Sequence, residues 1–509
     1  METKEYAEEP GQTLRDTSAA PADMRAAGES EESKRNRIDT CRKLAPATLV
    51  FALLCTLLLY KNGASVAVPL FVLAAGAFIL RMMALAGKSR PKRGTWFCLA
   101  IMLLLAVSDC LTDNAFIIAC NNAAIFLVLL TVLLHNYCDD TRWAFGTYFA
   151  AMLRCVGGSL GCVNDAARDL LCWGKASSKG NKQLLSALAG AALSAPLLAA
   201  VIALLCSADG GYAAQLGRLA EHIRVGAAVR IFLFFAAAFL GAYCSTRFLW
   251  QHRISCTAKE RRQFPSAAAC TSLFLFCIVY VSFTCSQFTT PPGAAVRPAA
   301  YAREGFFQLL AVSIINVLIV QTMLAHTKNN AALKVLLSVF CACTYLMIAS
   351  AAMRMIRYIS YYGALTFLRV VVLWALAVLA LLLSGQVIQI FRSRFPLFRY
   401  GFTVVCVCYA ALSLARPDYW IASYNLAHIE RNSGSLLHPE LGELRQLAAG
   451  TSCDAAPAFR RAGYLSVQGY NTKFDYTQIL REKLEGKALS PRTWNFSRAQ
   501  ARKLTESAD

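Results

Sequence analysis

The residues that could do chemistry in this 509-residue chain are charged and polar side chains placed where long apolar stretches end. The largest such group combines acids, arginines and a tyrosine: Asp209, Arg303, Glu304, Arg354, Arg357, Tyr358 and Arg369. Arg354 and Arg357 are three residues apart and therefore share one face of a helix. Two readings are open for this outer-interface cluster. It forms a salt-bridge belt that locks helices together, which we favour, or it binds an anionic ligand, a lipid headgroup or the C-terminal tail.

Two smaller sets of polar residues also deserve testing. Asp109 and Asp113 lie four residues apart near a helix end, and together with Asp209 they could supply the acids of an enzyme acting on lipid-linked substrates. Such a pair more often caps a helix or faces solvent. Asn316 and Gln321 lie within an apolar stretch, where an amide either hydrogen-bonds a neighbouring helix, which we favour, or lines a cavity.

No known catalytic signature is present. We find no phosphate-binding loop, no zinc-protease motif and no nucleophile elbow, and the six histidines show no metal-ligand spacing. Arg81 and Arg247 lie near the ends of apolar stretches, and we expect both side chains to reach the membrane interface. The sequence therefore predicts no cofactor and no metal, and it favours a protein that is not an enzyme.

The elements that must position these residues are long apolar blocks. The chain is 57% hydrophobic and only 16% charged, whereas a soluble protein is about a quarter charged. Blocks of about 17–25 residues match a helix that crosses roughly 30 Å of hydrocarbon. We predict eleven crossings, at 44–60, 65–86, 95–109, 115–135, 184–206, 228–250, 265–287, 305–326, 333–353, 368–390 and 400–415.

The basic loops explain most of the net charge of +21 and predict the orientation. Their basic residues gather where apolar blocks end: Lys88, Arg90, Lys92, Arg93, Arg253, Lys259, Arg261, Arg262, Arg392, Arg394 and Arg399. Cytoplasmic loops carry such an excess, so this pattern argues against nucleic-acid binding. We expect a cytoplasmic N-terminus, and eleven crossings then place the C-terminus outside. Arg354, Arg357 and Arg369 break the rule, because they fall on the outer side.

Three segments lie outside the regular crossings. Residues 1–43 are polar without an apolar period and predict a disordered cytoplasmic tail. Residues 136–183, within the membrane region 44–415, alternate apolar and polar residues at helical spacing and predict an amphipathic helix in the inner membrane interface. An additional crossing at 144–163 is the rival reading, and it would move the C-terminus inside.

The segment 416–509 is polar, mixed in charge and long enough for a small extramembrane domain. Helices are predicted from Pro417 to Ser433, at 439–449, near 476–484 and near 497–504, and we find no strong strand pattern. Tyr419, Trp420 and Tyr424 form a candidate patch for a protein partner.

Several polar stretches carry a family resemblance. They are Ser-Ala-Asp at 207–209, Tyr-Ala-Arg-Glu-Gly-Phe-Phe-Gln-Leu-Leu at 301–310, Arg-Met-Ile-Arg-Tyr-Ile-Ser-Tyr-Tyr-Gly at 354–363, Pro-Asp-Tyr-Trp-Ile-Ala-Ser-Tyr-Asn at 417–425 and Trp-Asn-Phe-Ser-Arg at 494–498. From about residue 95 the chain resembles a bacterial integral-membrane family, domain of unknown function 4173, and its 4153 relatives. An extra Ala364 and a degenerate stretch after Leu436 depart from the family pattern. The resemblance implies a bacterial polytopic membrane protein and implies no reaction.

Together these patterns predict an all-α, polytopic helical membrane protein of the cell membrane with a small helical C-terminal tail. Its expected partners are the lipid bilayer and a protein that binds the tail, with no nucleic acid. The favoured role is sensing, scaffolding or regulation through an extracytoplasmic interaction module. The alternatives are a transporter or channel for a small solute, and a membrane enzyme acting on lipid-linked substrates.

Overall fold

The computed structural model describes most of the chain. The described residues are 31–87, 91–138, 143, 145–177, 225–251, 264–289, 298–327, 330–433, 441–468, 473–487 and 490–507, with isolated positions between 190 and 215. Side chains are described for all of these except 31–33, 145, 174–177, 225, 287–289, 298–306, 432–433 and 468.

Ten helices in this part of the chain are long and apolar enough to cross a membrane. They are α1 (Glu31–Leu59), α2 (Ala67–Leu85), α3 (Arg93–Leu111), α4 (Ala115–Tyr137), α9 (Val225–Gln251), α10 (Ser266–Thr289), α11 (Pro298–His326), α12 (Ala331–Tyr362), α13 (Phe367–Phe391) and α14 (Leu397–Leu414). They confirm ten of the predicted crossings and the prediction of an all-α polytopic membrane protein. The predicted crossing at 184–206 lies largely outside the described residues.

The N-terminal prediction needs one correction. Helix α1 begins at Glu31, so residues 31–43 are helical where a disordered tail was expected. The reason is tertiary: Arg37 pairs with Asp169 at 3.2 Å and Cys41 is fully buried, so this polar stretch packs against neighbouring helices. Residues 1–30 lie outside the described part.

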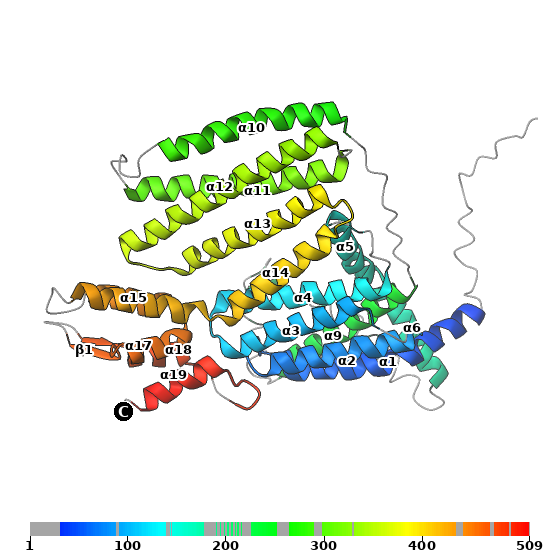
Figure 1. Ribbon diagram of the computed structural model, residues 1–509. Coiled ribbons are helices and arrows are strands. Elements are labelled where there is room, and N and C mark those ends of the chain that lie inside the picture. The colour runs from blue at the N-terminus through cyan, green and yellow to red at the C-terminus, as the bar shows by residue number, and fades with distance from the viewer. Residues whose placement is uncertain are drawn as a thin grey trace, which may run out of the picture.

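The spanning helices form two groups joined by α14 (Figure 1). Helices α10 to α13 pack around a core that includes Leu273, Phe340 and Leu383, while α2, α3 and α4 pack around Met102 and other residues. Helix α14 packs against both α13 and α3.

Short turns between antiparallel helices define two ends of this bundle (Figure 1). At one end, called the basic face, the start of α3 meets the end of α4, where Lys92 Nζ donates to the Cys138 carbonyl at 3.0 Å. The α13–α14 turn with Arg392 and Arg394 lies at the same end. The opposite end, called the tail face, carries the turns at 60–66, 112–114 and 363–366 and the C-terminal segment.

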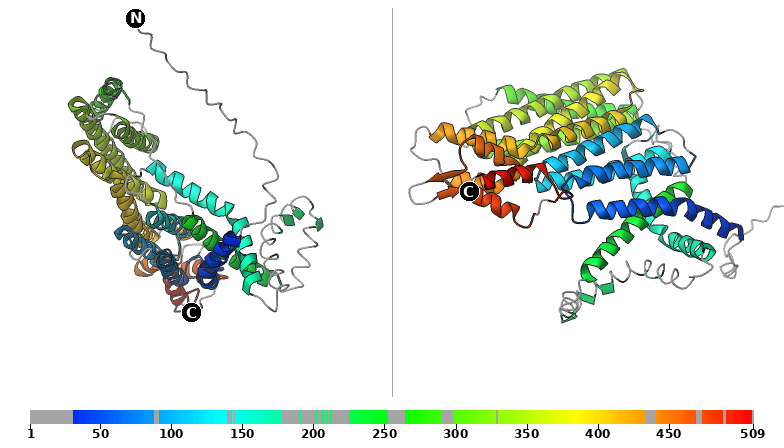
Figure 2. Two further views of the ribbon diagram at one scale, coloured as in Figure 1. Left: turned by 90° about the vertical axis from the view of Figure 1, so that its right-hand side faces the viewer. Right: turned by 90° about the horizontal axis from the view of Figure 1, so that it is seen from below.

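Two shorter helices fill the predicted amphipathic segment. Helices α5 (Phe145–Gly161) and α6 (Val163–Ser177) run across the ends of the spanning helices at the basic face (Figure 1, Figure 2). The Tyr148 ring of α5 stacks on Phe398 at the start of α14, with centroids 4.7 Å apart. Helix α9 starts toward the tail face, where Phe234 contacts Tyr60, and ends at the basic face, where Arg247 pairs with Asp169 of α6.

The C-terminal segment is a small domain with its own core. It contains α15 (Pro417–Ser433), α16 (Leu441–Gly450), a short 3-10 helix (Cys453–Ala455), α17 (Ala456–Arg461), β1 (Ser466–Gln468), β2 (Lys473–Asp475), α18 (Tyr476–Leu484) and α19 (Phe496–Glu506). The two strands are antiparallel, with Ser466 opposite Asp475. Phe459, Phe474 and Tyr476 stack inside the core. The four predicted helices occur, whereas α17 and the hairpin were missed because their segments are too short to show a period.

Candidate functional site

The contact between the C-terminal domain and the tail face is built on the turn between α3 and α4. Thr112 and Asn114 hold extended backbone, and the Asn114 side chain caps α4 by accepting from the Ile117 amide at 3.1 Å. The Thr112 hydroxyl accepts from the Asn114 amide at 3.2 Å. These local bonds fix the turn, and Asp113 between them is only 8% exposed. We call this contact the polar joint.

Asp113 is the most strongly paired acid of the polar joint. Its carboxylate accepts from Lys487 Nζ at 3.0 Å and from Arg498 Nε at 2.6 Å. Lys487 follows α18, and Arg498 lies in the first turn of α19, so both cations come from the C-terminal domain. A charge-assisted hydrogen bond is about twice as strong as a neutral one. One bundle carboxylate therefore ties two domain elements to the α3–α4 turn.

Two acids of the C-terminal domain bind the same turn from the other direction. Asp454, fully buried, accepts from the Thr112 hydroxyl and pairs with Arg416 at 3.2 Å. Burial raises the pKa of Asp454, and hydrogen bonds from Ser497 and Thr112 and the Arg416 charge oppose that rise. Asp418 accepts from Asn114 Nδ2 at 3.0 Å.

Asn495 completes the C-terminal end of α3. Its amide nitrogen donates to the carbonyls of Asp109 and Thr112, at 3.0 and 2.8 Å, while its oxygen caps α19 by accepting from the Arg498 amide at 3.1 Å. The last carbonyls of a helix have no partner within it, so one side chain here completes two helix ends. The neighbouring Trp494 carbonyl accepts from the Val66 amide at 3.0 Å, which adds the α1–α2 turn to the joint.

A second polar layer lies directly beneath the joint, inside the bundle. Asp109 is fully buried and accepts from Asn121 Nδ2 at 2.8 Å, while its second oxygen has no partner in the described structure. The Asn121 oxygen accepts from the hydroxyls of Tyr409 and Ser413, at 2.8 and 2.9 Å. Ser413 also bonds Ser108 at 2.6 Å. This layer links α3, α4 and α14.

The joint is arranged for coupling more than for catalysis. Asp113, Asp418 and Asp454 converge, but each carboxylate is bonded to side chains or backbone of the opposite part. Within the described residues, no group of three or more His, Cys, Asp and Glu side chains could hold a metal ion. Asp109 and Asp113 were expected to cap a helix or face solvent. That reading is wrong for both, because tertiary contacts bury them.

The predicted outer-interface cluster is brought together only in part. The Arg369 guanidinium lies over the Tyr358 ring, 4.5 Å from its centroid, and donates to the Ala364 carbonyl. The Asp209 carboxylate accepts from the Gly211 amide at 2.8 Å, and Arg357 is exposed. Arg354 is half-buried on α12. The side chains of Arg303 and Glu304 lie outside the described ones, so the salt-bridge belt stays a prediction.

The intramembrane amides separate into two cases. Asn316 is fully buried, accepts from the Tyr280 hydroxyl at 2.7 Å and donates to Thr344 at 3.1 Å. It thereby joins α10, α11 and α12, which is the hydrogen-bonding role expected for it. Gln321 is exposed on α11.

The predicted tail patch lies on α15. The side chains of Trp420 and Tyr424 are 60% and 40% exposed, whereas Tyr419 packs partly against the domain core. The Trp420 indole donates to the Ala415 carbonyl at 3.0 Å, which holds the ring beside the end of α14.

An ion network at the basic face was missed. Arg247 was expected to reach the membrane interface, but its side chain is 4% exposed and pairs with Asp169, which also binds Arg37 and the Tyr243 hydroxyl. The expectation was wrong because α6 covers this part of α9 with an acid. Asp165 and Asp169 lie four residues apart and so share one face of α6. This pair of acids was the feature of the sequence that could have indicated a basic partner.

The cations of the polar joint were also missed. Lys487 and Arg498 lie more than three hundred positions from Asp113, so no local spacing could indicate the pairing. Arg498 does belong to one of the stretches that carry the family resemblance, at 494–498.

Comparison with known proteins adds a family and no activity. The family model described as "Domain of unknown function (DUF4153)" matches residues 97–462. The match includes Asp113, Asp418 and Asp454 and ends before Lys487 and Arg498. Comparisons with curated proteins and with solved structures gave no match.

Proposed function

Because this chain belongs to the DUF4153 family, a family described only as of unknown function, we propose its role from its own geometry: it is a regulatory membrane protein whose C-terminal domain controls the bundle through the polar joint. Membership of the related 4173 family stays a prediction. The observation that carries the proposal is the binding of Asp113 by Lys487 and Arg498 together.

The joint suits a coupling role because it is both buried and polar. An apolar interface tolerates small displacements of the two surfaces. Buried hydrogen bonds require one geometry, and a buried group that loses its partner destabilises the interface. The second layer at Asp109, Asn121 and Ser413 is also buried and hydrogen-bonded, so the positions of α4 and α14 depend on the position of the end of α3. Movement of the C-terminal domain would thus alter three spanning helices.

We further propose that the domain faces outward and binds a protein partner through Trp420 and Tyr424. The basic face carries Lys92, Arg93, Arg392 and Arg394, and cytoplasmic ends of membrane proteins carry such an excess. The tail face would then be extracytoplasmic in a cell membrane. Exposed aromatic side chains beside a bundle suit a partner that binds at the membrane surface.

No observation favours the transporter or the enzyme as a second function. A solute pathway needs polar groups lining a space at mid-membrane. The side-chain amide of Asn316 instead hydrogen-bonds Tyr280 and Thr344 of neighbouring helices. An enzyme needs acids that are available to a substrate, and the acids of the joint are occupied.

Replacing Asp113 tests the proposal. Asp113→Asn leaves two cations without a carboxylate. Breaking a buried pair costs about 3–5 kcal/mol, and we expect about 2 kcal/mol here because part of the Lys487 side chain is exposed. Hydrogen exchange of the full-length protein in lipid nanodiscs should rise in α18 and α19 and also in the ends of α3, α4 and α14.

The control is Glu430→Gln, which removes an exposed acid of α15 outside the joint and should leave exchange unchanged. Exchange that rises in the C-terminal domain alone would show that the domain is attached without controlling the bundle, and the proposal would fail.

A further inference from the structure

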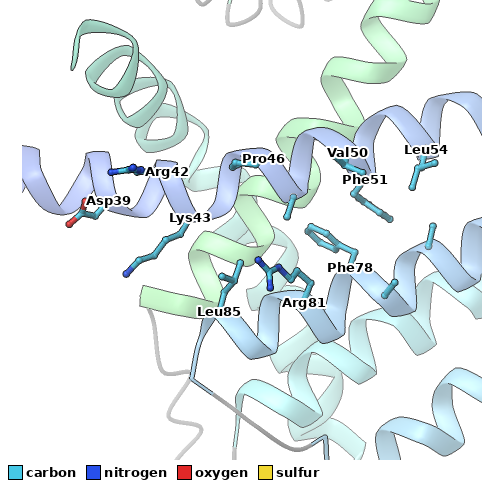
Figure 3. A pocket seen from close by; sticks show the side chains of 13 residues that line it. Asp39, Arg42, Lys43, Pro46, Val50, Phe51, Leu54, Phe78, Arg81 and Leu85 are labelled. Atoms are coloured by element: carbon cyan, nitrogen blue, oxygen red, sulfur yellow. The ribbon is translucent and has the colours of Figure 1, made fainter. Parts of the chain in front are cut away.

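A groove between α1 and α2 at the basic face has a shape and charge that the polar joint does not explain. Its volume is about 840 Å³, and it opens on the outside of the bundle between residues 39–54 of α1 and 74–85 of α2 (Figure 3). It lies outside the residues matched by the family model.

One end of the groove is cationic. Arg42, Lys43 and Arg81 line it, against a single acid, Asp39. Figure 3 shows Lys43 on α1 and Arg81 on α2 at the space between the two helices. All three cations are exposed, and none makes an ion pair with a described residue.

Arg81 places a positive charge from α2 at this end of the groove. It lies one turn before α2 ends at Leu85, among apolar neighbours. A charged side chain near a helix end extends to the headgroup level. The exposed Arg81 side chain lines the groove there, so an anionic headgroup in the groove would pair with it.

The rest of the groove is apolar and open toward lipid. Phe51 of α1 stacks on Phe78 of α2, with ring centroids 4.5 Å apart, and the side chains of Val50 and Leu54 are 57% and 37% exposed. From Lys43 to Leu54 a helix rises roughly 16 Å at about 1.5 Å per residue. Half of a hydrocarbon core of about 30 Å is roughly 15 Å. The groove therefore runs from the headgroup level to the middle of the bilayer.

We propose that this groove binds one anionic phospholipid from the membrane leaflet at the basic face. Lys43 and Arg81 hold the phosphate, Arg42 adds positive charge, and one acyl chain lies along Val50, Phe51 and Leu54. A zwitterionic lipid carries its own ammonium beside the phosphate and so gains less from these cations. Inorganic phosphate lacks the chain that the apolar length accommodates.

Lipid binding to the full-length protein in detergent tests the proposal. A phosphatidylglycerol with a fluorescent acyl chain is titrated and then displaced with unlabelled phosphatidylglycerol, phosphatidylcholine or glycerol 3-phosphate. Each basic residue near a membrane surface contributes about 1 kcal/mol to anionic lipid binding, so the Lys43→Gln/Arg81→Gln pair should raise Kd about 30-fold. Ala77→Trp, which fills the apolar part, should raise Kd without changing charge.

The matched control is Arg392→Gln/Arg394→Gln, which removes two exposed cations of the same face outside the groove and should leave Kd unchanged. Equal displacement by phosphatidylcholine, displacement by glycerol 3-phosphate alone, or an equal loss in the control pair would each overturn the proposal. If size-exclusion chromatography shows that the Lys43→Gln/Arg81→Gln variant does not fold, the single variants Lys43→Gln and Ala77→Trp test the site instead. An unchanged Kd in both single variants would refute the site.

Discussion

At the scale of single residues, three buried acids at the tail face differ in the partners that surround them. Asp113 has two cations, Asp454 has one cation and a hydroxyl, and Asp109 has one amide. Burying a carboxylate without a cation is costly, whereas two cations on one carboxylate strengthen the contact. The three acids should therefore respond differently to the same substitution.

We expect Asp109→Asn to keep the melting temperature of the full-length protein or to raise it. The amide oxygen can still accept from Asn121, and the substitution removes a group whose charged form has no cationic partner in the described structure. Asp109→Ala should cost about 1–3 kcal/mol, because it leaves the Asn121 amide unbonded. An equal loss in both variants would mean that the carboxylate itself is required at this depth.

Asp454 should make the attachment of the C-terminal domain depend on pH. Its pKa is raised in the folded state, so the folded state binds more protons than the unfolded state between pH 3.8 and the folded value. Stability from this group is complete below about pH 3.8 and is lost as pH rises through the folded pKa. Protection of α18 and α19 from proteolysis should then increase as pH falls toward 3.8, and the increase should be smaller in Asp454→Asn. The same pH profile in both proteins would contradict this assignment.

At the scale of elements, the turn between α12 and α13 shows how a turn and the C-terminal domain depend on each other. Gly363 ends α12 with a φ of 61°, and the His428 ring of α15 lies where a β-carbon at Gly363 would project. Asn425 binds Leu365 at both backbone groups, at 2.6 and 2.8 Å. Helix α15 can therefore approach this turn only because residue 363 is glycine.

Gly363→Ala should loosen α15 from the α12–α13 turn. The added methyl group meets His428, and the positive φ costs about a further 1 kcal/mol for a residue other than glycine. We expect a lower melting temperature and faster hydrogen exchange in α15. Gly401→Ala on α14 is the matched control, because its β-carbon would meet only Leu382 at 3.4 Å, an ordinary contact. Equal effects of the two substitutions would argue against this reading.

At the scale of the whole molecule, the faces at which the described helices begin and end indicate how the chain crosses the bundle. Helix α6 contacts the start of α1 at the basic face, and α9 begins toward the tail face. The chain thus leaves one side before residue 178 and returns from the other after residue 224. This polarity agrees with the crossing predicted at 184–206, which lies largely outside the described residues and stays a prediction. It also places the start of α1 and the C-terminal domain at opposite faces of the bundle.

Cysteine labelling in intact cells tests that arrangement. Ser435→Cys in the C-terminal domain should react with a membrane-impermeant maleimide, whereas Ser89→Cys between α2 and α3 should react only after the membrane is opened. Most native cysteines in the described chain are buried, and the unsubstituted protein measures their background. Labelling of both positions from the same side would contradict the proposed topology.

The sequence by itself determined the class of the protein, because an apolar block long enough to span a bilayer is a local property. It also predicted four of the five α-helices of the C-terminal domain, and its favoured interpretation of Asn316, a hydrogen bond to a neighbouring helix, agrees with the bonds to Tyr280 and Thr344. The resemblance stretches at 417–425 and 494–498 contain Asp418 and Asn495, but their spacing did not reveal the turn that they bind.

Only the tertiary structure decided which polar residues act together. Asp113 meets Lys487 and Arg498 across more than three hundred positions, and Arg247 meets Asp169 because α6 folds over α9. The groove of Lys43 and Arg81 likewise is formed only by two helices together, α1 and α2. Charge pairing and cavities depend on distance in space, and no period within one helix encodes that distance.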